Sequence, residues 1–230
     1  MYLGFYDGIF IWFTLWFLFW WGFVYILAPQ GVDHLRRYGY AAIYFLAAAA
    51  TVVYIFTDYF RELGDGFNEL PFFWLLILCA ADIVVYHALR RARSGQTEFV
   101  AHHPHVEFLA MSDRYLISKS AEIVFQQTLI VLLALILRDA GLGLSGIRLI
   151  FAIVFTLAHL PLLLIDGWEI GSFFITAAAV ASVFFPALIL GVHYGFVYSF
   201  MLHQAFYVAS GIMFWLYPHT NRHTSNMAVK

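Results

Sequence analysis

Residues 9–28, IFIWFTLWFLFWWGFVYILA, form a run of twenty positions without one charged side chain. An α-helix rises by about 1.5 Å per residue, so about 20 apolar residues cross the hydrocarbon core of a bilayer. The residues before the run include Asp7 and no lysine or arginine, and no small-residue cleavage site follows it. A secretory signal has a basic start and a shorter apolar core. We therefore expect this run to be a retained membrane span.

The composition of the whole chain also indicates a membrane protein. Of its 230 residues, 63% are hydrophobic, 20% are aromatic and only 11% are charged, and the mean hydropathy is +0.81. A soluble domain is about 45–50% apolar and about 25% charged. The net charge of −2 provides no field that would attract a polyanion. These values exclude a soluble enzyme, a disordered segment and a nucleic-acid-binding protein.

Six further apolar segments follow the first, and the sequence predicts an all-α bundle of seven transmembrane helices in one domain, residues 1–230. We expect the spans at residues 9–28, 38–57, 70–89, 116–137, 148–165, 171–190 and 193–216. The last two spans come from one stretch of 46 residues, which is too long for a single crossing. Gly191 and His193, which follow Pro186, mark the expected break.

The basic residues predict how the bundle is oriented. If the N-terminus is outside, nine of the twelve lysines and arginines lie in inner segments and three lie in outer segments. The inner residues are Arg36, Arg37, Arg90, Arg91, Arg93, Arg114, Lys119, Arg222 and Lys230. Cytoplasmic segments of membrane proteins carry an excess of lysine and arginine. We therefore expect the N-terminus outside and the C-terminus in the cytoplasm.

Among the ionisable side chains inside the expected spans, five stand out: Asp82, Glu122, His159, His193 and His203. Such groups are costly in a bilayer and usually face the bundle interior or a cavity. Counted along the helices, Asp82, Glu122 and His159 lie about 10 Å below the inner surface. His203 lies deeper, and His193 lies near the outer surface. We expect all of them except His193 to converge on one polar pocket that opens to the cytoplasm.

Several of these polar residues also have a purely structural interpretation. A lone histidine in a membrane span commonly bonds a backbone carbonyl or a serine of a neighbouring helix. Asp82 has two candidate partners for an ion pair, His87 and Lys119. Gln126 and Gln127 are typical of residues that join neighbouring helices by hydrogen bonds.

Two other features have ordinary explanations. The aromatic side chains of residues 9–28 are typical of lipid contact and of the interfacial belt. Residues 102–107, HHPHVE, contain metal-binding residue types but lack helical ligand spacing, which favours a solvated loop over a metal site.

Three segments resemble the motifs of the CPBP family of intramembrane proteases, the CAAX-prenyl-protease and bacteriocin-processing (Abi) group. That family carries EExxxR, FxxxH and HxxxN or HxxxD on three helices. Here residues 121–126 are AEIVFQ, residues 155–160 are FTLAHL and residues 203–207 are HQAFY. Glu122 and His159 are 37 residues apart, and His159 and His203 are 44 apart, in the order of the family. The resemblance covers about residues 115–216, which would form the CPBP-like core.

The resemblance implies that Glu122, His159 and His203 activate a water molecule for peptide hydrolysis. One carboxylate and two imidazoles also match a three-ligand site for a divalent metal such as zinc, so the same three residues are candidate metal ligands. The candidate substrate-binding residues are polar or aromatic side chains of the same helices and of the third span: Asp82, Phe125, Gln126, Phe155 and Tyr207.

The chain also departs from the family pattern. Ala121 stands where the family has its first glutamate, Gln126 stands where it has arginine, and Tyr207 stands where it has asparagine or aspartate. An alanine cannot accept a proton, and a missing general base costs orders of magnitude in rate. We therefore expect proteolysis to be weak or absent.

Three functions follow as expectations. The first is a divergent intramembrane hydrolase that acts on membrane peptides. The second is a non-catalytic relative that holds an apolar peptide, a prenyl chain or another membrane protein. The third is a cofactor-bearing membrane protein, for example a haem protein with two ligands from among His87, His159, His193 and His203.

Overall fold

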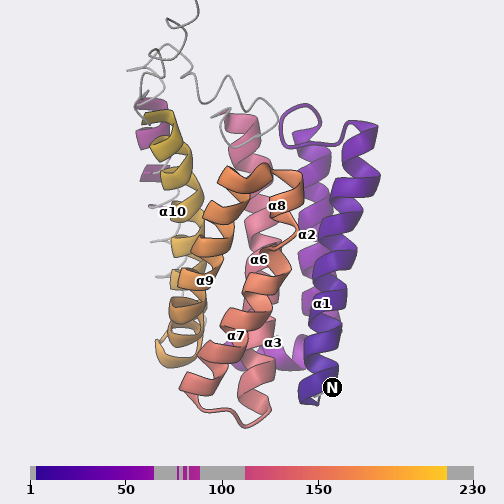
Figure 1. Cartoon of the computed structure of the whole chain (residues 1–230), viewed down its shortest axis with the longest axis vertical. Coiled ribbons are helices and arrows are strands. Elements are labelled where there is room, and N and C mark those ends of the chain that lie inside the picture. The colour runs from indigo at the N-terminus through magenta and orange to yellow at the C-terminus, as the bar shows by residue number, and fades with distance from the viewer. Residues whose placement is uncertain (1–3, 65–76, 78–79, 82, 89–111, 217–230) are drawn as a thin grey trace, which may run out of the picture.

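The computed structural model describes residues 4–64, 77, 80–81, 83–88 and 112–216, and every regular element in them is helical (Figure 1). The N-terminal helices are α1 (Phe5–Gly22), a π-helical turn (Phe23–Leu27), a 3-10 turn (Ala28–Gln30), α2 (Tyr38–Ile55) and α3 (Thr57–Gly64). The C-terminal helices are α6 (Asp113–Asp139), α7 (Leu144–His159), α8 (Leu162–Ile165), α9 (Gly167–Gly191) and α10 (Gly195–Leu216).

Five of the helical segments are long and apolar enough to cross a membrane: Phe5–Gln30, Tyr38–Ile55, Asp113–Asp139, Leu144–Ile165 and Gly167–Gly191. They coincide with five of the expected spans, and the all-helical architecture is confirmed for the described residues. The expected span at residues 70–89 lies mostly outside the described residues. The last expected span is helix α10, in which His203 and Gln204 lower the hydropathy. The count of seven spans is therefore not confirmed.

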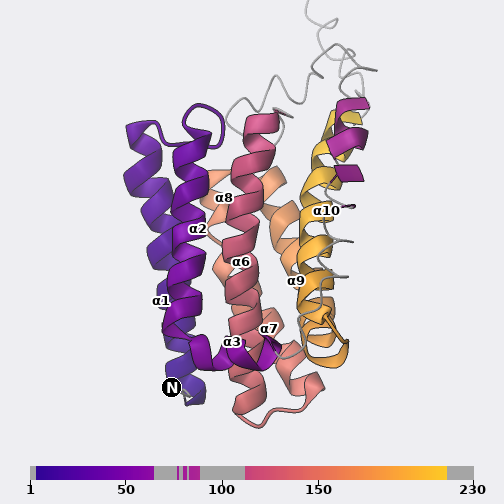
Figure 2. The same cartoon turned by 180° about the vertical axis from the view of Figure 1, so that it is seen from behind.

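Helix α6 is the central helix of the bundle. It packs against α1, α2, α7, α9 and α10, and Figure 2 shows it between α2 and α10. In its most apolar stretch, 83% of the residues are buried, against 17–33% in the other four segments. The outer helices instead expose large apolar side chains such as Phe10, Leu149 and Val180. Such surfaces suit contact with lipid.

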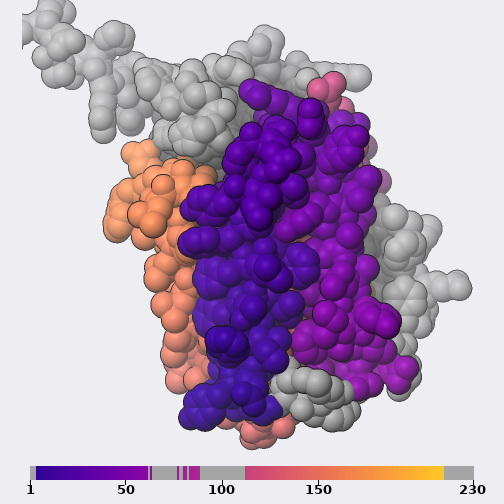
Figure 3. All heavy atoms as spheres, turned by 90° about the vertical axis from the view of Figure 1, so that its right-hand side faces the viewer, coloured from indigo at the N-terminus to yellow at the C-terminus, as the bar shows by residue number. Residues whose placement is uncertain are grey.

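Helices α1 and α2 lie side by side and form one face of the bundle (Figure 3). The hydroxyl of Tyr44 on α2 donates to the carbonyl oxygen of Phe19 on α1 at 2.7 Å. Among the aromatic residues of α1, for which we expect lipid contact, Phe10 is exposed, but Trp12 and Trp16 are buried. Trp12 faces α6, where its Nε1 donates to the carbonyl oxygen of Leu129 at 2.7 Å.

A tight turn separates α9 from α10 and confirms the predicted break. Helix α9 continues through Pro186 to Gly191, and the turn includes Tyr194 in the left-handed region at φ 59°. A Cβ atom on Gly195 would lie 1.5 Å from the carbonyl oxygen of Leu188, so no other residue type fits there. The chain then returns along α9, and α10 packs against it.

Candidate functional site

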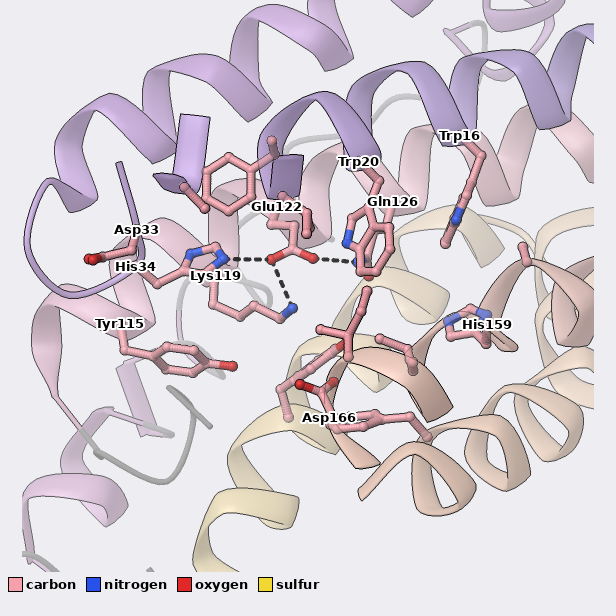
Figure 4. A pocket seen from close by; sticks show the side chains of 18 residues that line it. Trp16, Trp20, Asp33, His34, Tyr115, Lys119, Glu122, Gln126, His159 and Asp166 are labelled. Atoms are coloured by element: carbon pink, nitrogen blue, oxygen red, sulfur yellow. Dashed lines mark hydrogen bonds and ion pairs between the residues drawn. The ribbon is translucent and has the colours of Figure 1, made fainter. Parts of the chain in front are cut away.

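A pocket of about 300 Å³ lies at the end of the bundle where α1 ends, α6 begins and α7 leads into α8 (Figures 1 and 4). This volume is at the lower end of the range for small-molecule sites, about 300–1,000 Å³. The polar side chains that line it are Asp33, His34, Lys119, Glu122, Gln126, His159 and Asp166. The aromatic ones are Trp16, Trp20, Phe23, Tyr115, Phe174 and Tyr207.

Glu122 is the centre of a buried polar cluster. Its Oε2 lies 2.8 Å from Lys119 Nζ and 3.1 Å from His34 Nε2, and its Oε1 accepts from Gln126 Nε2 at 2.7 Å. Lys119 and Gln126 are three and four residues away on the same helix, so the helix itself brings them to Glu122. Glu122 is only 2% exposed. A buried carboxylate requires partners of this kind.

His34 reaches the cluster from the loop between α1 and α2, and the sequence analysis did not identify it. Its Nδ1 lies 2.9 Å from Ser118 Oγ, while its Nε2 faces Glu122. The carboxylate of Asp33 accepts the backbone N–H groups of Leu35 and Arg36, which holds this loop in place. The only signal for His34 in the sequence is its position close to the end of a span. That position does not reveal its partner Ser118, which is 84 residues away.

His159 is the last residue of α7 and lines the same pocket as Glu122. Its Nδ1 lies 2.7 Å from the carbonyl oxygen of Phe155. A carbonyl can only accept, so Nδ1 carries the proton and Nε2 is left with its lone pair. The structure thus brings together Glu122 and His159 from the three predicted catalytic residues.

His203 does not line this pocket, in contrast to the prediction. Its Nδ1 lies 3.4 Å from Gln127 Oε1, and Gln127 donates to Ser199 on α10. Positions 122 and 127 are separated by about 140° around a helix, so a partner of Gln127 approaches another side of α6 than a partner of Glu122. Gln127 therefore joins α6 to α10 as predicted, whereas Gln126 bonds within its own helix.

The predicted substrate-binding residues divide into two groups. Gln126 and Tyr207 line the pocket, and Lys119 Nζ lies 4.3 Å from the centre of the Tyr207 ring. Phe125 is buried in the aromatic core between α1 and α2 and does not reach the pocket. Phe155 packs behind His159 with ring centroids 4.6 Å apart.

Asp82 and residues 102–107 lie outside the described residues. Within the described part of the chain, no three His, Cys, Asp or Glu side chains are placed to share a metal ion. Glu122, His159 and His203 therefore do not form the expected zinc site.

Two of the candidate haem ligands are also engaged elsewhere. His193 contacts Tyr194 in the turn between α9 and α10, with ring centroids 3.8 Å apart, at the opposite end of the bundle from the pocket. His87 Nε2 lies 3.5 Å from Asp113 Oδ1. Neither histidine lines the pocket beside His159.

No protein-family model, curated protein or solved structure matches this chain. The resemblance to CPBP proteases therefore depends on the three short motifs alone, and functional inference depends on the geometry of the pocket.

Proposed function

We propose that this protein is a non-catalytic membrane protein that binds a lipid-like amphiphile in the pocket at the start of α6. The state of Glu122 carries the proposal. A general base must direct a free lone pair at a water molecule. A carboxylate has about four lone-pair positions, and three of those on Glu122 are taken by Lys119, His34 and Gln126. The ammonium of Lys119 lies 2.8 Å away. Glu122 thus serves as the anchor of an ion-pair cluster.

The lining of the pocket supports an amphiphilic ligand. The side chains of Lys119, Glu122 and His34 form one polar side of the pocket. Helix α1 contributes two indoles, that of Trp20 beside Gln126 and that of Trp16 toward His159 (Figure 4). Pockets for small molecules combine apolar walls with a few polar groups that set orientation. The polar end of the ligand would contact a polar group of the lining, and its apolar chain would lie against the aromatic side chains.

In the proposed orientation, the pocket end of the bundle faces the cytoplasm. The basic residues Arg36, Arg37 and Arg114 at this end support that orientation, because cytoplasmic segments are enriched in arginine and lysine.

The second candidate function is that of a divergent hydrolase resembling the CPBP proteases. One observation favours it: Glu122 and His159, from two of the three motifs, line the same pocket. Two observations disfavour it. Ala121, at the position of the family's first glutamate, is buried in the apolar core, and His203 bonds Gln127 outside the pocket.

The test compares two identical substitutions. Ala28 lines the pocket, and Ala28→Trp would fill it from the rim. Ala47→Trp adds the same indole to an exposed position of α2. Brominated long-chain amphiphiles that quench tryptophan fluorescence should bind the purified wild type saturably. Ala28→Trp should weaken binding by about tenfold or more, or about 1.4 kcal/mol, and Ala47→Trp should not change it.

Absence of saturable binding, or equal loss in both variants, would contradict the binding function. Incubation of the purified protein with prenylated peptides and with membrane peptides tests the second candidate function, that of a hydrolase. Turnover that disappears in Glu122→Gln and in His159→Gln would establish catalysis and overturn the proposal.

A further inference from the structure

Two polar ring atoms on the α1–α7 side of the pocket are without a partner in the described residues. Trp16 is 3% exposed, and its Nε1 is buried with no acceptor. His159 Nδ1 donates to its own helix, and no described group bonds Nε2. The two rings are in contact, with centroids 5.4 Å apart. Both rings line the pocket, and Figure 4 shows the Trp16 indole extending from α1 toward the His159 imidazole.

The two buried indoles of α1, those of Trp12 and Trp16, differ in their hydrogen bonding. Trp12, one turn earlier on α1, places its own Nε1 2.7 Å from a backbone carbonyl oxygen. A buried donor without an acceptor costs about 1–3 kcal/mol, so it indicates a missing partner. Trp16 is held between the Trp12 ring at 5.3 Å and the Phe155 ring at 5.8 Å, measured between centroids. This packing prevents the indole from swinging to another acceptor.

The two ring atoms require complementary chemistry. An indole Nε1 can only donate a hydrogen bond, and the free Nε2 of a neutral imidazole can only accept one. A hydroxyl oxygen both accepts and donates, so a single hydroxyl can satisfy Trp16 and His159 together. A carboxylate would present lone pairs to His159 Nε2 and would enter a pocket that already contains the carboxylates of Glu122 and Asp166. An ether oxygen has no proton to donate.

We propose that the ligand is an uncharged lipid alcohol whose hydroxyl accepts from Trp16 Nε1 and donates to His159 Nε2. The alkyl or prenyl chain of this alcohol would lie against the aromatic side chains of the pocket. This inference rests on the proposed binding function and names the class of ligand. In this assignment the cluster around Glu122 has a structural role. Lys119 and His34 hold the shape of the pocket and do not bind the hydroxyl.

The test uses three probes with the same chain: 1-hexadecanol, palmitate and hexadecyl methyl ether. Binding is measured on the full-length protein in detergent by competition against a brominated amphiphile. Hexadecanol should bind about three- to tenfold more tightly than either of the other two, as expected for one neutral hydrogen bond. Palmitate that binds as tightly as hexadecanol would overturn the assignment.

Matched variants separate the roles of the two ring atoms. Trp16→Phe removes the N–H and keeps the ring, and should weaken hexadecanol binding by about three- to tenfold. Trp21→Phe alters a neighbouring indole of α1 that does not line the pocket and should have no effect. His159→Phe should abolish the preference for the alcohol over the ether, whereas His159→Gln, which retains an acceptor, should preserve it.

The outcomes distinguish the two proposals. If none of the three probes binds saturably, the binding function itself is wrong. If all three bind equally well and Trp16→Phe has no effect, the binding function stands and the alcohol assignment fails, as it would if an ordered water satisfied both ring atoms. Thermal melting of each variant verifies that the bundle is intact.

Discussion

Helix α6 begins with a polar half and ends with an aliphatic half, and both halves contribute buried side chains to the bundle. Residues 129–137, LIVLLALIL, are all aliphatic, and none is more than 4% exposed. The first half carries Ser118, Lys119, Glu122, Gln126 and Gln127, which are also shielded by neighbouring elements. Burial therefore does not distinguish the pocket end from the rest of the core. The difference lies in whether the neighbouring elements supply polar partners.

The partners of the polar half come from other parts of the chain as well as from α6. The α1–α2 loop supplies His34 for Glu122, and α10 supplies Ser199 for Gln127. Gln204 on α10 also donates to Ser120 at 3.1 Å. The aliphatic half needs only side chains of matching shape. A central membrane helix thus tolerates polar residues where several elements meet at one end of the bundle.

The largest effect is expected from Glu122→Ala, which removes the anchor of the polar half. Lys119, whose side chain is 12% exposed, and His34 would lose their buried counter-ion. Removal of one partner of a buried ion pair costs about 3–5 kcal/mol. The free energy of unfolding, measured by denaturant titration in mixed micelles, should fall by this amount.

The double variant Lys119→Met, Glu122→Gln is the control for this prediction. It removes both charges at similar side-chain volume, so it should recover most of the lost free energy of unfolding. If Glu122→Ala is as stable as the wild type, the cluster around Glu122 does not anchor the pocket end of the bundle.

A smaller effect is expected from Leu133→Ala in the aliphatic half. Leu133 is fully buried, and its truncation leaves a cavity. We expect a loss of about 2–3 kcal/mol in the free energy of unfolding, in the lower part of the range for buried leucines, because lipid provides little hydrophobic driving force. Leu149→Ala, at a position 62% exposed, is the matched control and should change it little. Equal losses in both variants would mean that α6 is not the centre of the packing.

The smallest effect is expected from Gln127→Leu, which breaks the polar link to Ser199 without creating a cavity. Hydrogen bonds between membrane helices contribute about 0.6 kcal/mol on average and about 1.7 kcal/mol at most. Hydrogen exchange should increase in α10 near Ser199 while the exchange of α2 stays the same. Gln30→Leu, at an exposed position in the turn after α1, is the control and should alter neither helix. Faster exchange in α2 would indicate general loosening of the bundle.

Much of the fold could be predicted because it depends on lengths and polarity along the chain. The uncharged run at residues 9–28 lies within the helical segment Phe5–Gln30, and residues 116–137 lie within Asp113–Asp139. The break near Gly191 was predicted because the stretch of 46 residues is too long for a single crossing. The candidate site was predicted in part, because depth along a helix follows from residue counting. Residue counting placed Glu122 and His159 in one layer, and both side chains line the pocket.

The sequence by itself determined that the chain is helical and apolar, and it located the described spans to within a few residues. It also placed two ionisable groups, Glu122 and His159, in the same layer. Only the tertiary structure decided that His34 and Trp16 belong to the pocket and that His203 does not. The physical reason is rotation about the helix axis. A helix that is apolar on all sides satisfies the bilayer at any rotation, so its sequence does not say which side faces α6. Packing against neighbouring helices sets that rotation and hence selects the side chains that meet.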